Sequence, residues 1–183
     1  MIFPDITRTN EDLQQILHLQ QRNLKQNLDE TEKDEQGFVT LQHDLPTLQQ
    51  MHEIAPSIII KDDDSIVGYA LTMLPECRIL VPDLEPMFSL LQTLHWNNNP
   101  LRSCKYYVMG QVCIAKEHRG RGLFRTLYHH HREVYQSDFD LLITEISMQN
   151  RRSIRAHEKV GFVPIHTHSD ELDEWSVVAW DWS

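Results

Sequence analysis

Residues 106–146 contain a strand, a glycine-bearing loop, a helix and a second strand in direct succession, and this order restricts the possible folds more than any other feature. The apolar and β-branched residues of Tyr106–Ile114 and Phe139–Ile146 predict the two strands, and the segment from about Gly122 to Gln136 predicts the helix. A unit of this kind joins two parallel strands of one sheet through a right-handed crossover. We therefore expect a sheet that contains a parallel pair of strands.

Further strands and helices are expected on both sides of this unit. Thr9 and Asp12 form a capping-box pattern before a helix that extends toward Leu28. Asp44 suits the N-cap of another helix, and β-branched runs on either side of Asp62–Asp64 predict a hairpin. The remaining expected elements are strands at residues 2–6, 37–41, 162–166 and 175–182 and helices at about 86–94 and 153–160. This mixture predicts an α/β (α+β) fold, with a central sheet covered by helices.

The composition is that of an ordinary globular protein. With 183 residues, 40% hydrophobic and 24% charged, the chain suits one domain over residues 1–183. It contains no apolar run near the ~20 residues of a membrane helix, and its first residues lack the features of a signal peptide. Three cysteines without metal-ligand spacing are typical of a reduced, cytoplasmic protein, and we expect no metal. The net charge of −10 argues against a nucleic-acid partner.

The loop between the first strand and the helix has the composition of an anion site. Gly120 and Gly122 allow a tight turn, and the first turn of the following helix offers unpaired N–H groups and the positive end of its dipole. Such a helix start binds phosphate oxygens, and Arg119 and Arg121 add positive charge. The loop matches neither a Walker A sequence nor a dinucleotide fingerprint. An ordinary turn with arginines is the alternative interpretation.

Two blocks of sequence together resemble the GNAT acetyltransferases. The first is Arg119-x-x-Gly122-x-Phe124, similar to the family's acetyl-CoA loop, with Phe124 where glycine or alanine is usual. The second runs from Asn150 to Phe162 and resembles the family's Asn-led helix and its Tyr-Glu-Lys-x-Gly-Phe ending, with His157 in place of the tyrosine. The resemblance implies a GNAT-like mixed, mostly antiparallel central sheet with the parallel strand pair at the acetyl-CoA site.

The resemblance also implies the residues that bind the cofactor. The backbone of Val112, Cys113 and Ile114 would hydrogen-bond the pantetheine arm, and Asn150 would contact the same arm from the second block. The pyrophosphate would bind the loop formed by Arg119, Gly120, Arg121, Gly122, Leu123 and Phe124.

Two residues are candidates for acid–base chemistry. Glu145 matches the place at which ribosomal-protein N-acetyltransferases carry a catalytic glutamate, and a structural carboxylate is the alternative. His157 lies where many members place the tyrosine that protonates the departing thiolate. An imidazole could donate that proton, could only hydrogen-bond the sulfur, or could take no part.

Other residues are interpreted as structural. Three consecutive histidines, residues 129–131, point about 100° apart on a helix and cannot share one metal ion, so we expect them at the surface or in a groove. Cys113 is expected to be a small buried hydrophobe rather than a nucleophile.

The expected activity is transfer of an acetyl group from acetyl-CoA to a small-molecule or peptide amine that the sequence does not identify. A non-catalytic module that binds or senses acyl-CoA is the alternative. The acceptor is expected near residues 29–36 and 75–105, whose acidic side chains favour a cationic amine. A homodimer is a reasonable expectation for a soluble protein of this kind.

Overall fold

The computed structural model describes residues 1–29, 31, 33, 38–171 and 173–183, and its main feature is a seven-stranded sheet in the order β1-β2-β3-β6-β7-β9-β8. The strands are β1 (Ile2–Ile6), β2 (Ile58–Asp62), β3 (Ser65–Met73), β6 (Tyr106–Ile114), β7 (Leu141–Ser147), β8 (Val163–Ser169) and β9 (Glu174–Asp181). A separate two-stranded ribbon consists of β4 (His95–Trp96) and β5 (Asn99–Pro100). Neighbouring strands are antiparallel except β6 and β7, which are parallel. The predicted fold class is confirmed.

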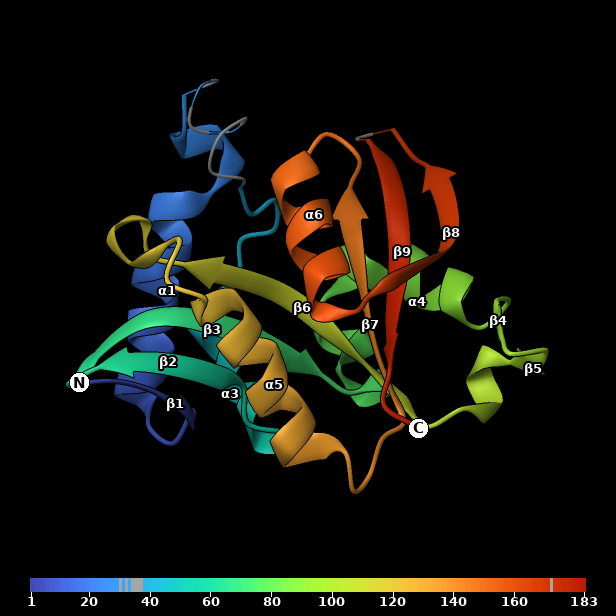
Figure 1. Cartoon of the computed structure of the whole chain (residues 1–183), viewed down its shortest axis with the longest axis horizontal. Coiled ribbons are helices and arrows are strands. Elements are labelled where there is room, and N and C mark those ends of the chain that lie inside the picture. The colour runs from blue at the N-terminus through green and yellow to red at the C-terminus, as the bar shows by residue number, and fades with distance from the viewer. Residues whose placement is uncertain (30, 32, 34–37, 172) are drawn as a thin grey trace.

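Helices cover both faces of the sheet. They are α1 (Asn10–Asn23), α3 (Leu45–Ile54), α4 (Glu85–Leu91), α5 (Leu123–Tyr135) and α6 (Arg151–Val160). In Figure 1, α5 and α6 lie in front of the sheet, and α1, α3 and α4 lie behind it. Short 3₁₀ turns occur at Lys25–Asn27, Pro75–Leu80, Pro82–Leu84, Leu101–Ser103 and Lys116–His118. The core between the layers is built from β-branched strand residues and from the apolar faces of the helices.

The parallel strands β6 and β7 separate after three paired residues. Pairing covers Tyr106–Val108 and Leu141–Ile143, and Figure 1 shows the two strands moving apart beyond that point. A bulge bends β6 there, because three residue steps from Met109 to Val112 face two steps on β3. The divergence leaves an opening in the sheet, bordered by the second half of β6 and the end of β7.

Gly110 lies inside this bulge, where β6 passes close to β3. A Cβ atom on Gly110 would lie 2.2 Å from the Sδ atom of Met73. Only glycine allows the two strands to approach this closely without moving the methionine.

The sequence located most elements within a few residues. The capping box of Thr9 and Asp12 and the N-cap at Asp44 are both present. The first helix ends at Asn23, however, and not near Leu28. Leu24 leaves the helix in an extended conformation and is 1% exposed, so its burial beside the following loop outweighs continuation of the helix.

The expected strand at residues 37–41 is not a strand in its described part. Residue 37 lies outside the described residues, and Val39 forms only an isolated parallel bridge with Leu24. Within the described part of the chain, no helix has the length and apolar character needed to cross a membrane.

Candidate active site

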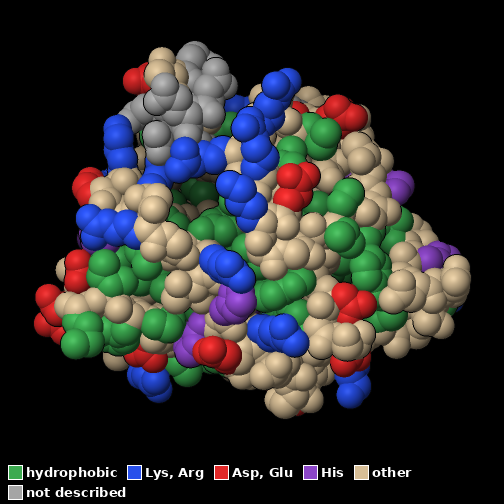
Figure 2. All heavy atoms as spheres, in the orientation of Figure 1, with side chains coloured by type: hydrophobic (Ala, Val, Ile, Leu, Met, Phe, Trp, Pro, Cys, Tyr) green, Lys and Arg blue, Asp and Glu red, His purple; other side chains and the backbone are tan. Residues whose placement is uncertain are grey.

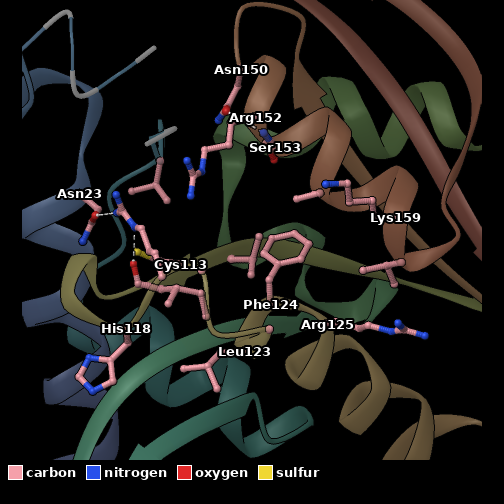
Figure 3. Close-up of a pocket in the computed structure, with 18 of the residues that line it drawn as sticks. Asn23, Cys113, His118, Leu123, Phe124, Arg125, Asn150, Arg152, Ser153 and Lys159 are labelled. Atoms are coloured by element: carbon pink, nitrogen blue, oxygen red, sulfur yellow. Dashed lines mark hydrogen bonds between the residues drawn. The ribbon is translucent and has the colours of Figure 1, made fainter. Parts of the chain in front are cut away.

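A pocket of about 440 Å³ lies where β6 and β7 separate, between the start of α5, the face of α6 and the end of α1. Figure 3 shows side chains from these elements converging on it. Its walls are formed by Asn23, Phe38, Val39, Val112, Cys113, Ile114, His118, Arg119, Gly120, Gly122, Leu123, Phe124, Arg125, Asn150, Arg152, Ser153, Ala156, Lys159 and Val160.

The glycine loop presents bare backbone to this pocket. Gly120 and Gly122 have φ angles of 75° and 79°, and a Cβ atom at either position would meet nothing within 4 Å. Glycine is therefore needed for the backbone conformation and not for space. Helix α5 begins directly after Gly122 with no side-chain cap, so the first-turn amides have no partner within the helix and face the same loop.

Arg119 holds the loop to its surroundings. Its Nε donates to the carbonyl oxygen of Ile114 at 3.0 Å, and its Nη2 donates to Oδ1 of Asn23 at 2.5 Å, as the dashed lines in Figure 3 show. One guanidinium thus joins the end of β6 to the end of α1. Arg121 was predicted to belong to the same anion site, but it is exposed and does not line the pocket.

Positive charge gathers on the pocket although the protein carries a net charge of −10. Arg119, Arg125, Arg152 and Lys159 line it, and no described Asp or Glu does. Figure 2 shows lysine and arginine side chains around a hollow on this face of the molecule. Such a wall attracts an anion, and a pocket with several cations suits a ligand that carries more than one phosphate.

Asn150 joins the pocket to the segment after α1. Its Oδ1 accepts a hydrogen bond from the amide of Ser153 at 3.1 Å and thereby caps α6. Its Nδ2 donates to the carbonyl oxygen of Phe38 at 3.2 Å. Both side-chain atoms of Asn150 are therefore used within the protein, and its side chain shapes the pocket through these bonds.

His157 is buried beneath the pocket wall and does not line it. Its side chain lies among Phe124, Tyr128 and Phe162, and the residue is 2% exposed. The Nδ1 atom lies 2.8 Å from the carbonyl oxygen of Ser153, so it must carry the proton. The Nε2 atom then accepts from the hydroxyl of Tyr128 at 2.5 Å. Burial lowers the pKa of His157 to about 4, and the ring is neutral near neutral pH.

Glu145 lies on β7, two residues beyond the last pair with β6. Its carboxylate contacts Nε2 of His168, and its side chain is 13% exposed. Burial raises the pKa of Glu145, and the hydrogen bond and charge of His168 act in the opposite direction. Glu145 is thus near the opening between the strands but outside the wall of the pocket.

Cys113 behaves as the sequence predicted. It is 7% exposed, and burial raises the pKa of its thiol to about 12, which opposes formation of a nucleophilic thiolate. Within the described residues, no group of three or more histidine, cysteine or acidic side chains could hold a metal ion.

The sequence predicted the glycine loop but not most of the pocket wall on the α6 side. Ser153, Ala156 and Lys159 recur every three residues on the face of α6 toward the pocket, with Arg152 beside them, and this periodicity was visible in the sequence. Phe38 is brought to the pocket only by tertiary contacts, and the sequence carried no signal for it.

The diverging parallel strands and the glycine loop beside a cation-lined pocket fit the class of acyltransferases that the sequence resembles, and comparison with known proteins supports that class. A sequence model of the acetyltransferase (GNAT) family matches residues 13–162. The chain belongs to this family and is an acyltransferase. No curated protein sequence matches the chain significantly.

Solved structures share the fold at low sequence identity. The ribosomal-protein-S18-alanine N-acetyltransferase from Escherichia coli has a TM-score of 0.67 and 14% identity, over 100% of this chain and 95% of that chain. The structure of yncA from Salmonella typhimurium with its cofactor acetyl-CoA has a TM-score of 0.63 and 12% identity, again over 100% and 95%. A spermidine N-acetyltransferase SpeG chimera from Vibrio cholerae and hSSAT has a TM-score of 0.61 and 13% identity, over 99% and 95%.

Proposed function

We propose that this chain is an N-acetyltransferase that moves the acetyl group of acetyl-CoA directly to an amine. One observation carries the proposal: the opening between β6 and β7 leads into a cation-lined pocket that ends at the bare amides of α5. The family to which the chain belongs and the neighbour with acetyl-CoA support the same donor.

The described residues fit this donor along the whole pocket. Past Val108, the edge of β6 that faces β7 is free of strand pairing. The backbone groups of Val112–Ile114 on this edge, apart from the Ile114 carbonyl oxygen that Arg119 holds, are therefore available to the amides of a pantetheine arm. The loop from Gly120 to Phe124 offers N–H groups for a pyrophosphate. Arg125 and Lys159 extend the positive charge outward for a further phosphate.

Acetyl-CoA supplies an activated thioester carbonyl when it is bound. The protein then has to hold the amine beside that carbonyl and remove a proton from it. We assign proton removal to Glu145, because a partly buried carboxylate with a raised pKa is a better base than an exposed one and lies at the opening.

For His157 we propose a structural role in place of the proton donation suggested by its position in the sequence. Its one N–H bond points to a carbonyl oxygen of its own helix, and its other nitrogen accepts from Tyr128. A buried imidazole with a pKa of about 4 has no proton available for a thiolate near neutral pH.

The acceptor class is proposed from charge. The turn between β8 and β9 carries Asp170 and Asp173, and the charge of Asp170 acts on Glu145, which favours an amine with further positive charge. One neighbour is named for the alanine of ribosomal protein S18 and another for spermidine, and spermidine is an amine of this kind. Most of the acidic segment 29–36, also expected near the acceptor, lies outside the described residues.

Calorimetric titration with acetyl-CoA tests donor binding. Gly122→Asp places a carboxylate at the loop and should abolish binding. Asn98→Asp adds the same charge at another residue with positive φ, in the β4–β5 turn, which does not line the pocket, and should bind normally. Equal binding by wild type and Gly122→Asp would contradict the assigned phosphate loop.

A thiol-release assay with acetyl-CoA then tests transfer. The amines are spermidine, free lysine and a peptide with an N-terminal alanine. Acetyl-CoA binding without thiol release for any amine would favour the alternative, a module that senses acyl-CoA without catalysis. Gel filtration with light scattering tests the expected homodimer.

A further inference from the structure

A carboxylate and an imidazole meet across an intervening strand next to the opening in the sheet. Glu145 belongs to β7 and His168 to β8, and β9 lies between these two strands. Adjacent strands are about 4.8 Å apart, so the two side chains reach over β9 to make the contact between Oε1 and Nε2. Two residues on neighbouring strands could form such a contact without reaching across a third strand.

Both side chains of the pair are largely shielded from solvent, Glu145 more than His168. The side chain of Glu145 is 13% exposed and that of His168 is 23% exposed. A buried carboxylate without a partner takes up a proton and becomes neutral, so it can no longer act as a base. The hydrogen bond from His168 counteracts this loss.

Among the described residues, His168 and Asp170 act on the pKa of Glu145 in addition to burial. Burial raises the pKa of Glu145, and the charge of Asp170 raises it further. His168 lowers the pKa of Glu145 through a hydrogen bond and through its charge. The ring of His166 lies almost parallel to that of His168, with centroids 6.2 Å apart and planes at 19°, and supports it from the same strand.

We propose that His168 is a positioning residue for Glu145, which it holds ionised and oriented so that the second carboxylate oxygen can take the proton of the acceptor amine. This inference rests on the proposed acetyl transfer and adds to it a residue from an element that the family's sequence blocks do not include.

The proton balance of the step is complete. The N–H bond of the acceptor ammonium breaks, its proton moves to Glu145, and the electron pair stays on nitrogen. The C–N bond then forms and the C–S bond breaks. The second proton lost by the nitrogen balances the proton taken up by the departing thiolate, and Glu145 returns its proton to solvent.

The test measures the titration of Glu145 by ¹³C NMR on protein labelled at the glutamate carboxyl carbon and saturated with CoA. Glu145→Gln assigns the resonance. His168→Ala should raise the pKa of Glu145, because the group that lowers it is lost. His168→Gln keeps an N–H donor and should restore part of the shift. Asp170→Asn should move the pKa down, and His166→Ala, the matched control on β8, should change it little.

The acidic limb of kcat/KM should move in the same directions, measured with acetyl-CoA and the fastest of the three amines. An unchanged titration of Glu145 in His168→Ala overturns the inference, as does an equal loss of kcat at every pH. These results differ from failure of the proposed function, in which wild-type protein releases no thiol with any of the amines.

Discussion

The ring of Phe124 stands almost perpendicular to the imidazole of His157, with 5.0 Å between the centroids and 87° between the planes. These two residues are the departures from the family pattern visible in the sequence, and in the structure they are neighbours. Tyr128 contacts both of them, at 5.0 Å from Phe124 and 5.2 Å from His157. The three rings form one aromatic unit between α5 and α6, so a change at one position should affect the others.

Acidification should destabilise the protein through His157. Burial lowers its pKa from 6.5 to about 4, so between these values the unfolded chain binds more protons than the folded one. Stability is therefore full above pH 6.5 and falls as the pH approaches 4, by roughly 1.4 kcal/mol per unit at most. The free energy of unfolding, measured in urea at several pH values, should fall less steeply with decreasing pH in His157→Gln than in the wild type. His129→Gln, on the exposed side of α5, is the control with an unchanged slope.

Arg119 and Asn23 should act as one unit in donor binding. Arg119→Gln and Asn23→Ala each remove the 2.5 Å bond that holds the loop to α1. Each should weaken acetyl-CoA binding by roughly tenfold, about 1.4 kcal/mol, as for a lost hydrogen bond to a charged group. The double variant should lose little more than either single one, because the same bond is absent in all three. Calorimetry measures the three affinities, and full additivity would exclude the coupling.

Lys159 should contribute to donor affinity and Arg155 should not. Both are exposed cations on α6, but only Lys159 lines the pocket. Lys159→Gln should weaken acetyl-CoA binding by about fivefold, close to 1 kcal/mol, as expected for an exposed charge pair. Arg155→Gln removes the same charge one turn away and should bind as the wild type does. The difference in acetyl-CoA affinity between the two variants should become smaller at high salt.

A single methyl group added at Gly110 should destabilise the protein. A Cβ atom there would lie 2.2 Å from Sδ of Met73, so Gly110→Ala should destabilise the protein by about 1–3 kcal/mol. Met73→Ala makes room for that atom, so the double variant should lose less than the sum of the two single losses. Thermal or urea unfolding of the four proteins completes the cycle. If the loss in the double variant equals the sum of the two single losses, the bulge, and not the contact with Met73, causes the destabilisation by Gly110→Ala.

The sequence predicted those parts of the fold that depend on local chemistry. The capping box at Thr9 and the helix start after Gly122 follow from hydrogen-bonding groups a few residues apart, and both were located. His131 was misplaced at the surface. It is fully buried with its Nδ1 atom 2.9 Å from the hydroxyl of Tyr107, a strand residue that the helix pattern does not reveal.

The site was predictable where one segment builds it and not where distant segments meet. The glycine loop is continuous in sequence, whereas Asn23 reaches it across 96 residues. The contact of Glu145 with His168 depends on β9 lying between β7 and β8, and strand order cannot be read from the separate strands.

The divergence of β6 from β7 also bears on how such proteins evolve. The separated strand offers a ligand its peptide groups, which every residue except proline possesses. Mutations that keep the strand extended can then accumulate at Val112–Ile114 at little cost to the ligand. Relatives that keep this geometry need not keep the same amino acids, as the shared fold at 14% identity illustrates.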